Sequence, residues 1–181
     1  MNTWLRPCAI TMVAFLLAGC FEITARHDIN LYGDSDNGIY RIRFDNFTYS
    51  MISSDQGWSD FMGNLRRFSN PRIRNSGDYV YIEDTSGLSA MEHFYDDYRC
   101  SRNADGRTAD CRYVFNFSDG NNAPGWKINW EVSLRPDTRV ISSNHHRERT
   151  QSGYRHLYWN YEYSRHTGGR VDFTVRVPVA R

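Results

Sequence analysis

Histidines are the side chains in this sequence best suited to proton transfer or metal binding near neutral pH. The chain has six of them, including the pair His145 and His146, with Glu148 close behind. Neighbouring residues on a strand point to opposite faces, so this pair would rarely bind one ion, and we expect a polar loop there. His93 and Asp97 have the spacing of one helix face, but two ligands do not complete a metal site. The sequence therefore predicts no metal ligand.

A serine hydrolase needs a nucleophile on a sharp turn, a histidine and an acid. No G-x-S-x-G motif occurs, and Ser142 and Ser143 lack flanking glycines. No glycine loop for phosphate is found either. We expect no catalytic residue and no cofactor. An envelope hydrolase stays open as an alternative, which a serine or aspartate bonded to a histidine in a cleft would favour.

The stretch GDSDNG at 33–38 contains ligands of the type that calcium prefers. An EF-hand loop needs glycine at its sixth position, and counting from Asp34 the glycine arrives at the fifth. A hairpin turn at Asn37 and Gly38 accounts for these residues better.

The first 20 residues differ in composition from the rest. Arg6 precedes an apolar stretch at 9–18, which is interrupted only by Thr11. This stretch is too short to span a bilayer as a helix, which needs roughly 20 residues, but it has the length of a secretory signal. The residues LAGC that end at Cys20 resemble the bacterial lipobox. That resemblance implies a lipoprotein signal peptide at 1–19, acylation of Cys20 and cleavage before it.

The mature chain is then a single envelope domain at 20–181, anchored by its acyl chains. Phe21, not aspartate, follows Cys20. By analogy with proteobacterial sorting, this favours the periplasmic side of the outer membrane over the inner membrane. The formal net charge of the whole chain is only +1, so no global field attracts nucleic acid.

Two cysteines remain once Cys8 is removed with the signal and Cys20 is acylated. An exported chain meets an oxidising compartment, where Cys100 and Cys111 should form a disulfide. A turn at 105–106 (Asp-Gly) would close the hairpin between them. A zinc pair is the alternative, although no further cysteine pair completes such a site.

Alternation of apolar and polar residues is the strongest structural signal and predicts half-buried antiparallel strands. It is clearest at 126–134, 155–163 and 170–179. Further strands are expected at 22–32, 39–49, 78–83, 111–118 and 138–143.

Two segments have helical spacing instead. One contains Trp58, Phe61, Met62, Leu65 and Phe68, and the other contains Leu88, Met91, Tyr95 and Tyr98, with Ser89 and Glu92 at capping-box spacing. These elements predict an α+β fold with an antiparallel sheet of about six to eight strands and two helices packed on one face.

Aromatic residues are dense on the expected strands and make up 15 % of the chain. They can line a pocket for an apolar ligand, or they can simply form the core. The residues in question are Tyr40, Tyr49, Tyr79, Tyr81, Tyr113, Trp126, Trp130, Trp159, Tyr161 and Tyr163.

A further resemblance rests on RVISSN at 139–144, LYWNY at 157–161 and VDFTVRV at 171–177, together with the lipobox, the D-x-D-N-G turn and IYRIRF at 39–44. With these motifs the chain resembles the LppM-like group of bacterial envelope lipoproteins. It departs from that group in lacking a C-terminal transmembrane helix and in the hairpin between Cys100 and Cys111. The resemblance implies an α+β envelope domain without established catalysis and adds no functional residue beyond the lipid anchor.

We therefore expect a non-enzymatic, lipid-anchored envelope protein. Its partners would be the membrane, through the anchor, and an envelope protein, lipid or glycan. The alternative is a carrier or sensor that holds a small apolar ligand in an aromatic pocket.

Overall fold

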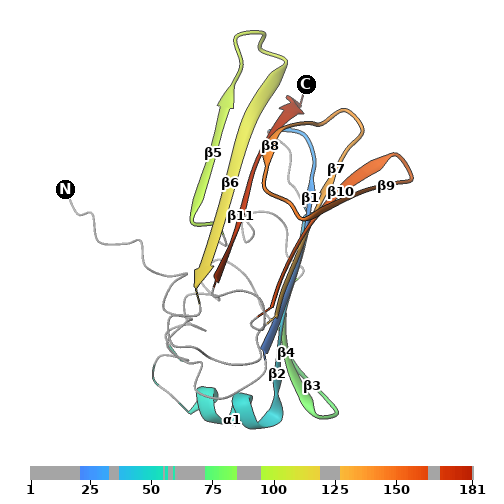
Figure 1. The fold of residues 1–181 in the computed structure, drawn as a ribbon. Helices are drawn as coiled ribbons and strands as arrows, with labels where there is room; N and C mark the ends of the chain where they lie inside the picture. The colour runs from blue at the N-terminus through green and yellow to red at the C-terminus, as the bar shows by residue number, and fades with distance from the viewer. Residues whose placement is uncertain are drawn as a thin grey trace, which may run out of the picture.

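The computed structural model describes residues 21–32, 37–54, 56, 59, 72–84, 95–118, 127–162 and 168–180. In these residues the chain forms two β-sheets and one α-helix, α1 (Asn46–Ser53) (Figure 1). The strands in chain order are β1 (Phe21–Ile29), β2 (Asn37–Asp45), β3 (Arg72–Ser76), β4 (Tyr79–Asp84), β5 (Asp97–Arg102), β6 (Thr108–Ser118), β7 (Lys127–Leu134), β8 (Arg139–Ser143), β9 (Arg147–Gln151), β10 (Tyr154–Glu162) and β11 (Gly168–Pro178).

The larger sheet has seven strands in the order β3-β4-β2-β1-β7-β10-β9. Its neighbouring strands are antiparallel, except that β1 and β7 run parallel. A parallel pair cannot be joined by a hairpin and needs a long connection. Here the chain between β1 and β7 supplies that connection. It forms β2, β3 and β4 of the same sheet and β5 and β6 of the second sheet.

The smaller sheet has four antiparallel strands in the order β5-β6-β11-β8. The chain enters it after β4, leaves it after β6, and returns for β8 and β11. Asn144 links the two sheets directly after β8. Its side-chain oxygen accepts hydrogen bonds from Trp159 Nε1 on β10, at 2.7 Å, and from the backbone N–H of Asp172 on β11, at 2.9 Å.

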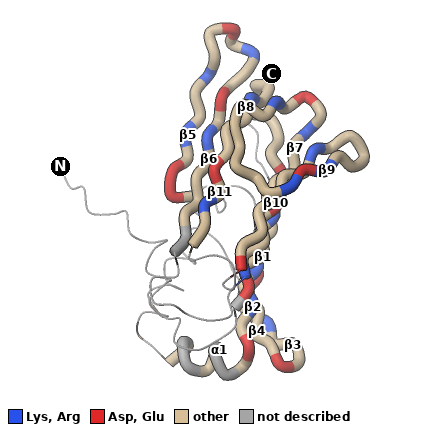
Figure 2. Tube along the Cα trace, in the orientation of Figure 1, with Lys and Arg blue, Asp and Glu red and all other residues tan. Residues whose placement is uncertain are grey.

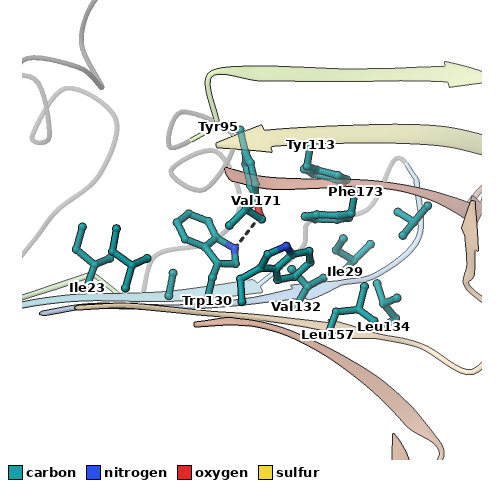
Figure 3. Close-up of a cluster of buried hydrophobic side chains, with 14 of the residues drawn as sticks. Ile23, Ile29, Tyr95, Tyr113, Trp130, Val132, Leu134, Leu157, Val171 and Phe173 are labelled. Carbon is teal, nitrogen blue, oxygen red and sulfur yellow. Dashed lines mark hydrogen bonds between the residues drawn. The ribbon is translucent and has the colours of Figure 1, made fainter. Parts of the chain in front are cut away.

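The hydrophobic core lies between the two sheets, because both present apolar residues at every second position (Figure 3). Trp130 and Trp159 come from the larger sheet, and Phe173 and Tyr113 from the smaller one. All four side chains are at most 2 % exposed. Tyr113 and Phe173 stack on each other with their ring centroids 4.8 Å apart.

The expected α+β arrangement with two helices on one face is wrong. A second sheet, not a helix layer, covers the apolar face of the first, because β6 and β11 carry the same alternation as β7 and β10. α1 contacts β2 and β4 at one end of the larger sheet (Figure 1). The described residues contain no helix that is long and apolar enough to cross a membrane.

The expected second helix is also corrected where the structure describes it. Tyr98 belongs to strand β5, and Tyr95 lies buried between the sheets just before that strand. Residues 88–94, with the expected capping box, and the stripe at 58–68, apart from residue 59, lie outside the described residues. Spacing of three and four residues is a weak signal where sheet packing decides the backbone.

The predicted strands agree with the structure better than the predicted helices do. Each of the eight expected strands overlaps an observed one, but the segment 39–49 ends as a strand at Asp45 and continues as α1. Asn37 and Gly38 are the first residues of β2, paired with Asp28 and His27, so the hairpin turn predicted there is wrong. Of the calcium candidate at 33–38, residues 33–36 lie outside the described residues, and Asn37 and Gly38 belong to β2.

Candidate functional site

The outer face of the seven-stranded sheet carries an ordered set of polar side chains. Arg43 on β2 lies 2.8 Å from one carboxylate oxygen of Glu22 on β1. Asn129 on β7 donates a hydrogen bond of 2.8 Å to the other Glu22 oxygen, and its own side-chain oxygen accepts one of 2.8 Å from Asn160 on β10. These four residues form a chain of contacts across four strands, which we call the outer polar network.

Arginine and tyrosine side chains extend this face towards β4 and β3. The guanidinium of Arg43 lies 4.6 Å from the ring centroid of Tyr79, and that of Arg41 lies 5.6 Å from the ring of Tyr81. Arg41 also forms an ion pair of 2.6 Å with Glu83. Cation–π contact and ion pairing together restrict the guanidinium groups to a few orientations.

The same face continues over β7, β10 and β9. His156 Nδ1 lies 2.9 Å from a Glu131 carboxylate oxygen, and the Arg147 guanidinium lies 5.3 Å from the ring of Tyr158. This face therefore displays positioned charges and aromatic rings from β3 to β9. Sequence alternation placed these residues on one side of each strand, but it contained no information on which strands are neighbours.

Arginines and carboxylates are interspersed along the chain at the end of the molecule where β1 finishes (Figure 2). Four exposed arginines there have no carboxylate partner within the described ranges. We call them the distal arginine group: Arg102, Arg107, Arg139 and Arg149. Two comparable exposed cations without a carboxylate partner among the described residues lie away from this end. Lys127 is in register with Glu22 at the start of β1, and Arg72, on the edge strand β3, is level with Thr24.

The disulfide between Cys100 and Cys111 is present, as predicted, and joins directly opposed residues of β5 and β6. Cys111 is 2 % exposed and belongs to the core. The Tyr98 hydroxyl donates a hydrogen bond of 3.1 Å to Cys100 Sγ, which has no hydrogen of its own in a disulfide.

The turn of this hairpin lies at Asp105 and Gly106, as predicted. Gly106 adopts a φ of 65°, a conformation that glycine favours. The Asp105 carboxylate accepts hydrogen bonds from the backbone N–H groups of Arg107 and Thr108, at 2.8 and 3.0 Å, and from the Thr108 hydroxyl at 2.9 Å. These bonds lower the pKa of Asp105.

The carboxylate of Asp110, on β6, is held across the smaller sheet. Arg176 on β11 donates hydrogen bonds of 2.7 and 2.8 Å to the two carboxylate oxygens of Asp110. Asn103 donates a further bond of 3.0 Å. The hydrogen bonds from Arg176, followed by that from Asn103, lower the pKa of Asp110 to about 2.

His27 is a buried histidine that sequence reasoning did not single out. It points into the core because it follows Ile23 and Ala25 in the alternation of β1, and it is fully buried. Its Nδ1 lies 3.0 Å from the Tyr95 hydroxyl, which also accepts a hydrogen bond of 3.3 Å from Trp130 Nε1 (Figure 3). The polar position within an otherwise apolar stripe was the signal that could have found it.

His145 lies within hydrogen-bond reach of a serine, the first condition set for a hydrolase. Its Nδ1 is 2.9 Å from Ser143 Oγ, and its Nε2 is 3.5 Å from a carboxylate oxygen of Glu148. However, Ser143 Oγ also accepts a hydrogen bond of 3.2 Å from the backbone N–H of His145. A serine that bonds to the backbone two residues further on is typical of a local turn. Glu148 is 40 % exposed and is also paired with Arg155. We therefore assign these contacts to the turn between β8 and β9.

His146 has different partners from its neighbour. Its Nδ1 accepts the backbone N–H of Asn160 at 3.1 Å, and its ring packs edge-on against Tyr161. Within the described ranges, no three histidine, cysteine, aspartate or glutamate side chains lie close enough together to hold a metal ion. Asp97 pairs with Arg99 on β5, whereas His93 lies outside the described residues.

The aromatic residues divide between the core, to which both sheets contribute, and the outer face of the larger sheet. Tyr113, Trp130, Trp159 and Tyr161 are buried, and the rings of Phe115 and Trp130 stack with centroids 4.7 Å apart. Tyr79 and Tyr81 lie instead on the outer face with the arginines. Tyr49 packs against the core from α1. The side chain of Tyr40, and Trp126 and Tyr163 as a whole, lie outside the described part of the chain.

The proposed lipidation residue, Cys20, and the signal segment 1–19 also lie outside the described residues, so both stay predictions. Comparison with known proteins adds no relative: no protein-family model matches the chain, and no curated protein matches it. The resemblance to the LppM-like group likewise stays a prediction.

Proposed function

We propose that this protein is a lipid-anchored bacterial envelope protein that acts by binding a partner and not by catalysis. The observation that carries the binding role is the outer polar network. Glu22, Arg43, Asn129 and Asn160 are linked side chain to side chain across four strands. Ordered polar groups on a rigid sheet lose little conformational entropy when a partner binds them.

Export is supported by two separate features. The apolar segment and the lipobox-like residues that end at Cys20 have the layout of a lipoprotein signal. The disulfide between Cys100 and Cys111 suits an oxidising compartment. Phe21 after Cys20 favours the outer membrane in a Gram-negative host.

The first test is the intact mass of the protein purified from its native membrane. We expect a chain that begins at Cys20, carries acyl groups and lacks the two hydrogens of the reduced Cys100–Cys111 pair. A Cys20→Ser variant exported with a cleavable, non-lipoprotein signal should be found in the soluble fraction. An unmodified mass from Met1, or retention of that variant in the membrane, would contradict the anchor.

The binding role needs a separate test. A photo-crosslinking residue introduced at Thr24, which is exposed on the outer face of the larger sheet, should capture a specific envelope component. The matched control is Ser142, which is exposed on the smaller sheet. Capture at Thr24 should be lost in an Arg43→Ala variant. Equal capture at both positions would argue against the outer face as the binding surface.

A further inference from the structure

The proposed anchor would attach at one end of the larger sheet. Cys20 directly precedes Phe21, the first residue of β1, so their Cα atoms are separated by only about 3.8 Å. β1 has nine residues and ends at Ile29. At roughly 3.3 Å per residue, its far end lies on the order of 30 Å from the anchor at Cys20.

The distal arginine group lies at that far end, as the strand registers establish. Arg149 pairs with His156 on β10, which pairs with Ser133 opposite Asp28 near the end of β1. Arg139 pairs with Arg176 near the end of β11. In the smaller sheet, the backbone oxygen of Arg107 accepts the N–H of Val179, and Arg102 lies over Tyr32, which follows β1.

The carboxylates at this end are already bonded within the protein. Arg176 pairs with Asp110, Arg135 with Asp137, Arg155 with Glu148 and Arg26 with Asp28. Asp105 is bonded to its own turn. The four arginines of the distal group have no ion-pair partner in the described ranges. The carboxylate of Asp105, which is held only by uncharged donors, keeps its negative charge beside Arg107, so the arginines at this end are in excess over it.

We propose that the distal end binds an anionic glycan polymer that carries phosphate or carboxylate groups. The guanidinium fork matches both groups in two-point hydrogen bonds. The arginines are spread over the β5–β6 hairpin, β8 and β9, so a small anion would reach only some of them, whereas an extended polymer contacts several. This inference rests on the proposed lipid anchor for its orientation: the anchor places this end away from the membrane, facing the envelope.

The test uses inorganic polyphosphate as the probe and two variants of equal net charge. One is Arg107→Gln with Arg139→Gln at the distal end, and the control is Arg72→Gln with Lys127→Gln, at positions away from that end. All four residues are exposed and lack a carboxylate partner among the described residues. Binding is followed by fluorescence anisotropy at about 0.15 M salt, where exposed charges act only over about 8 Å. Melting temperatures verify that both variants fold.

We expect the distal variant to raise the Kd for polyphosphate about tenfold and to reduce the salt dependence of binding, because two phosphate contacts are lost. The control variant should bind within about twofold of wild type. Equal losses in both variants, or no measurable binding by the wild type, would overturn the proposal. So would binding of anionic phosphatidylglycerol vesicles without binding of polyphosphate, which would assign this end to a membrane surface.

The proposed lipid anchor and the proposed polymer binding can be tested independently. The mature protein in neutral-lipid nanodiscs and the soluble Cys20→Ser chain are compared with the same probe. Equal polyphosphate binding by both forms supports the distal site whatever the state of the anchor. Loss of membrane attachment is read from nanodisc assembly, which does not depend on polyphosphate.

Discussion

The inner and outer faces of the two sheets are built from the same strands but have opposite properties. Along β7, Ile128, Trp130 and Val132 are at most 2 % exposed, whereas Asn129 and Glu131, between them, are half-buried and bonded to other polar side chains. A strand turns successive side chains to opposite faces, so one sequence segment serves both.

This difference indicates where stability and recognition reside. Burial of apolar surface contributes roughly 25 cal/mol per Å², so the free energy of folding is concentrated between the sheets. Exposed polar contacts contribute little to stability and are free to vary. The outer faces can therefore carry partner-specific residues without loss of the fold, and changes on the two faces should differ in size.

The largest effect is expected from Phe173→Ala. Phe173 is fully buried and stacks on Tyr113, so the change leaves a cavity and should lower the free energy of unfolding by about 3–5 kcal/mol. The matched control is Thr174→Ala, the next residue on the same strand, which points outward and should cost less than about 0.5 kcal/mol. Urea denaturation followed by tryptophan fluorescence measures both. Similar losses would show that the two faces do not differ as described.

The next largest effect concerns the covalent link at the inner face of the β5–β6 hairpin. A double Cys100→Ser, Cys111→Ser variant should lose about 2–4 kcal/mol, because the disulfide restricts the unfolded chain. Denaturant midpoints of oxidised and reduced wild-type protein check the same contribution. If reduction left the midpoint unchanged, the bridge would contribute nothing to stability.

The ion pair between Asp110 and Arg176, on the outer face of the smaller sheet, should contribute less to the free energy of unfolding, and its contribution should depend on pH. Asp110 has a pKa of about 2 in the folded protein, below its ordinary value of 3.8, owing to the hydrogen bonds from Arg176 and Asn103. Its stabilisation is therefore fully present above pH 3.8 and is lost as the pH falls through about 2.

Asp110→Asn should accordingly lower stability by about 1 kcal/mol near neutral pH, a value reduced by solvent screening at this half-buried site. The difference from wild type should shrink below about pH 4. Thermal unfolding of both proteins across this range provides the measurement. A difference that grew on acidification would contradict the assigned direction of the pKa shift.

The smallest effect is expected within the outer polar network. Asn129→Ala removes hydrogen bonds to Glu22 and Asn160 but leaves the core intact, so it should cost about 0.5 kcal/mol. A double-mutant cycle with Asn160→Ala isolates their coupling. A loss as large as that of Phe173→Ala would place the network among the determinants of folding.

Prediction from the sequence succeeded where the signal was local. The alternation at 126–134, 155–163 and 170–179 identified β7, β10 and β11, and the turn at Asp105 and Gly106 closes the β5–β6 hairpin. Strands β3 and β9 were missed because all their residues are exposed, so they carry no apolar alternation. The helix that was expected to include Tyr98 failed because that residue pairs with Tyr113 in a sheet.

The candidate surfaces were less predictable than the strands. The polar type of Glu22, Asn129 and Asn160 could be read from the sequence, but their contact depends on β1 pairing with β7 over a long separation. The distal arginine group similarly depends on which hairpins end on the same side. Local composition does not show which strands pair, because the hydrogen bonds between strands are made by the backbone, which is the same for nearly all residues.

Residue types and short spacings were enough to predict the alternating faces and the pair of cysteines that forms the disulfide. Both are local properties of the chain. The packing of the strands was needed to establish three other features: a second sheet covers the first, His27 is buried beside Tyr95, and four arginines without a carboxylate partner in the described part of the chain share one end. The reason is physical: an apolar face requires burial, but a helix layer and a second sheet satisfy that requirement equally well.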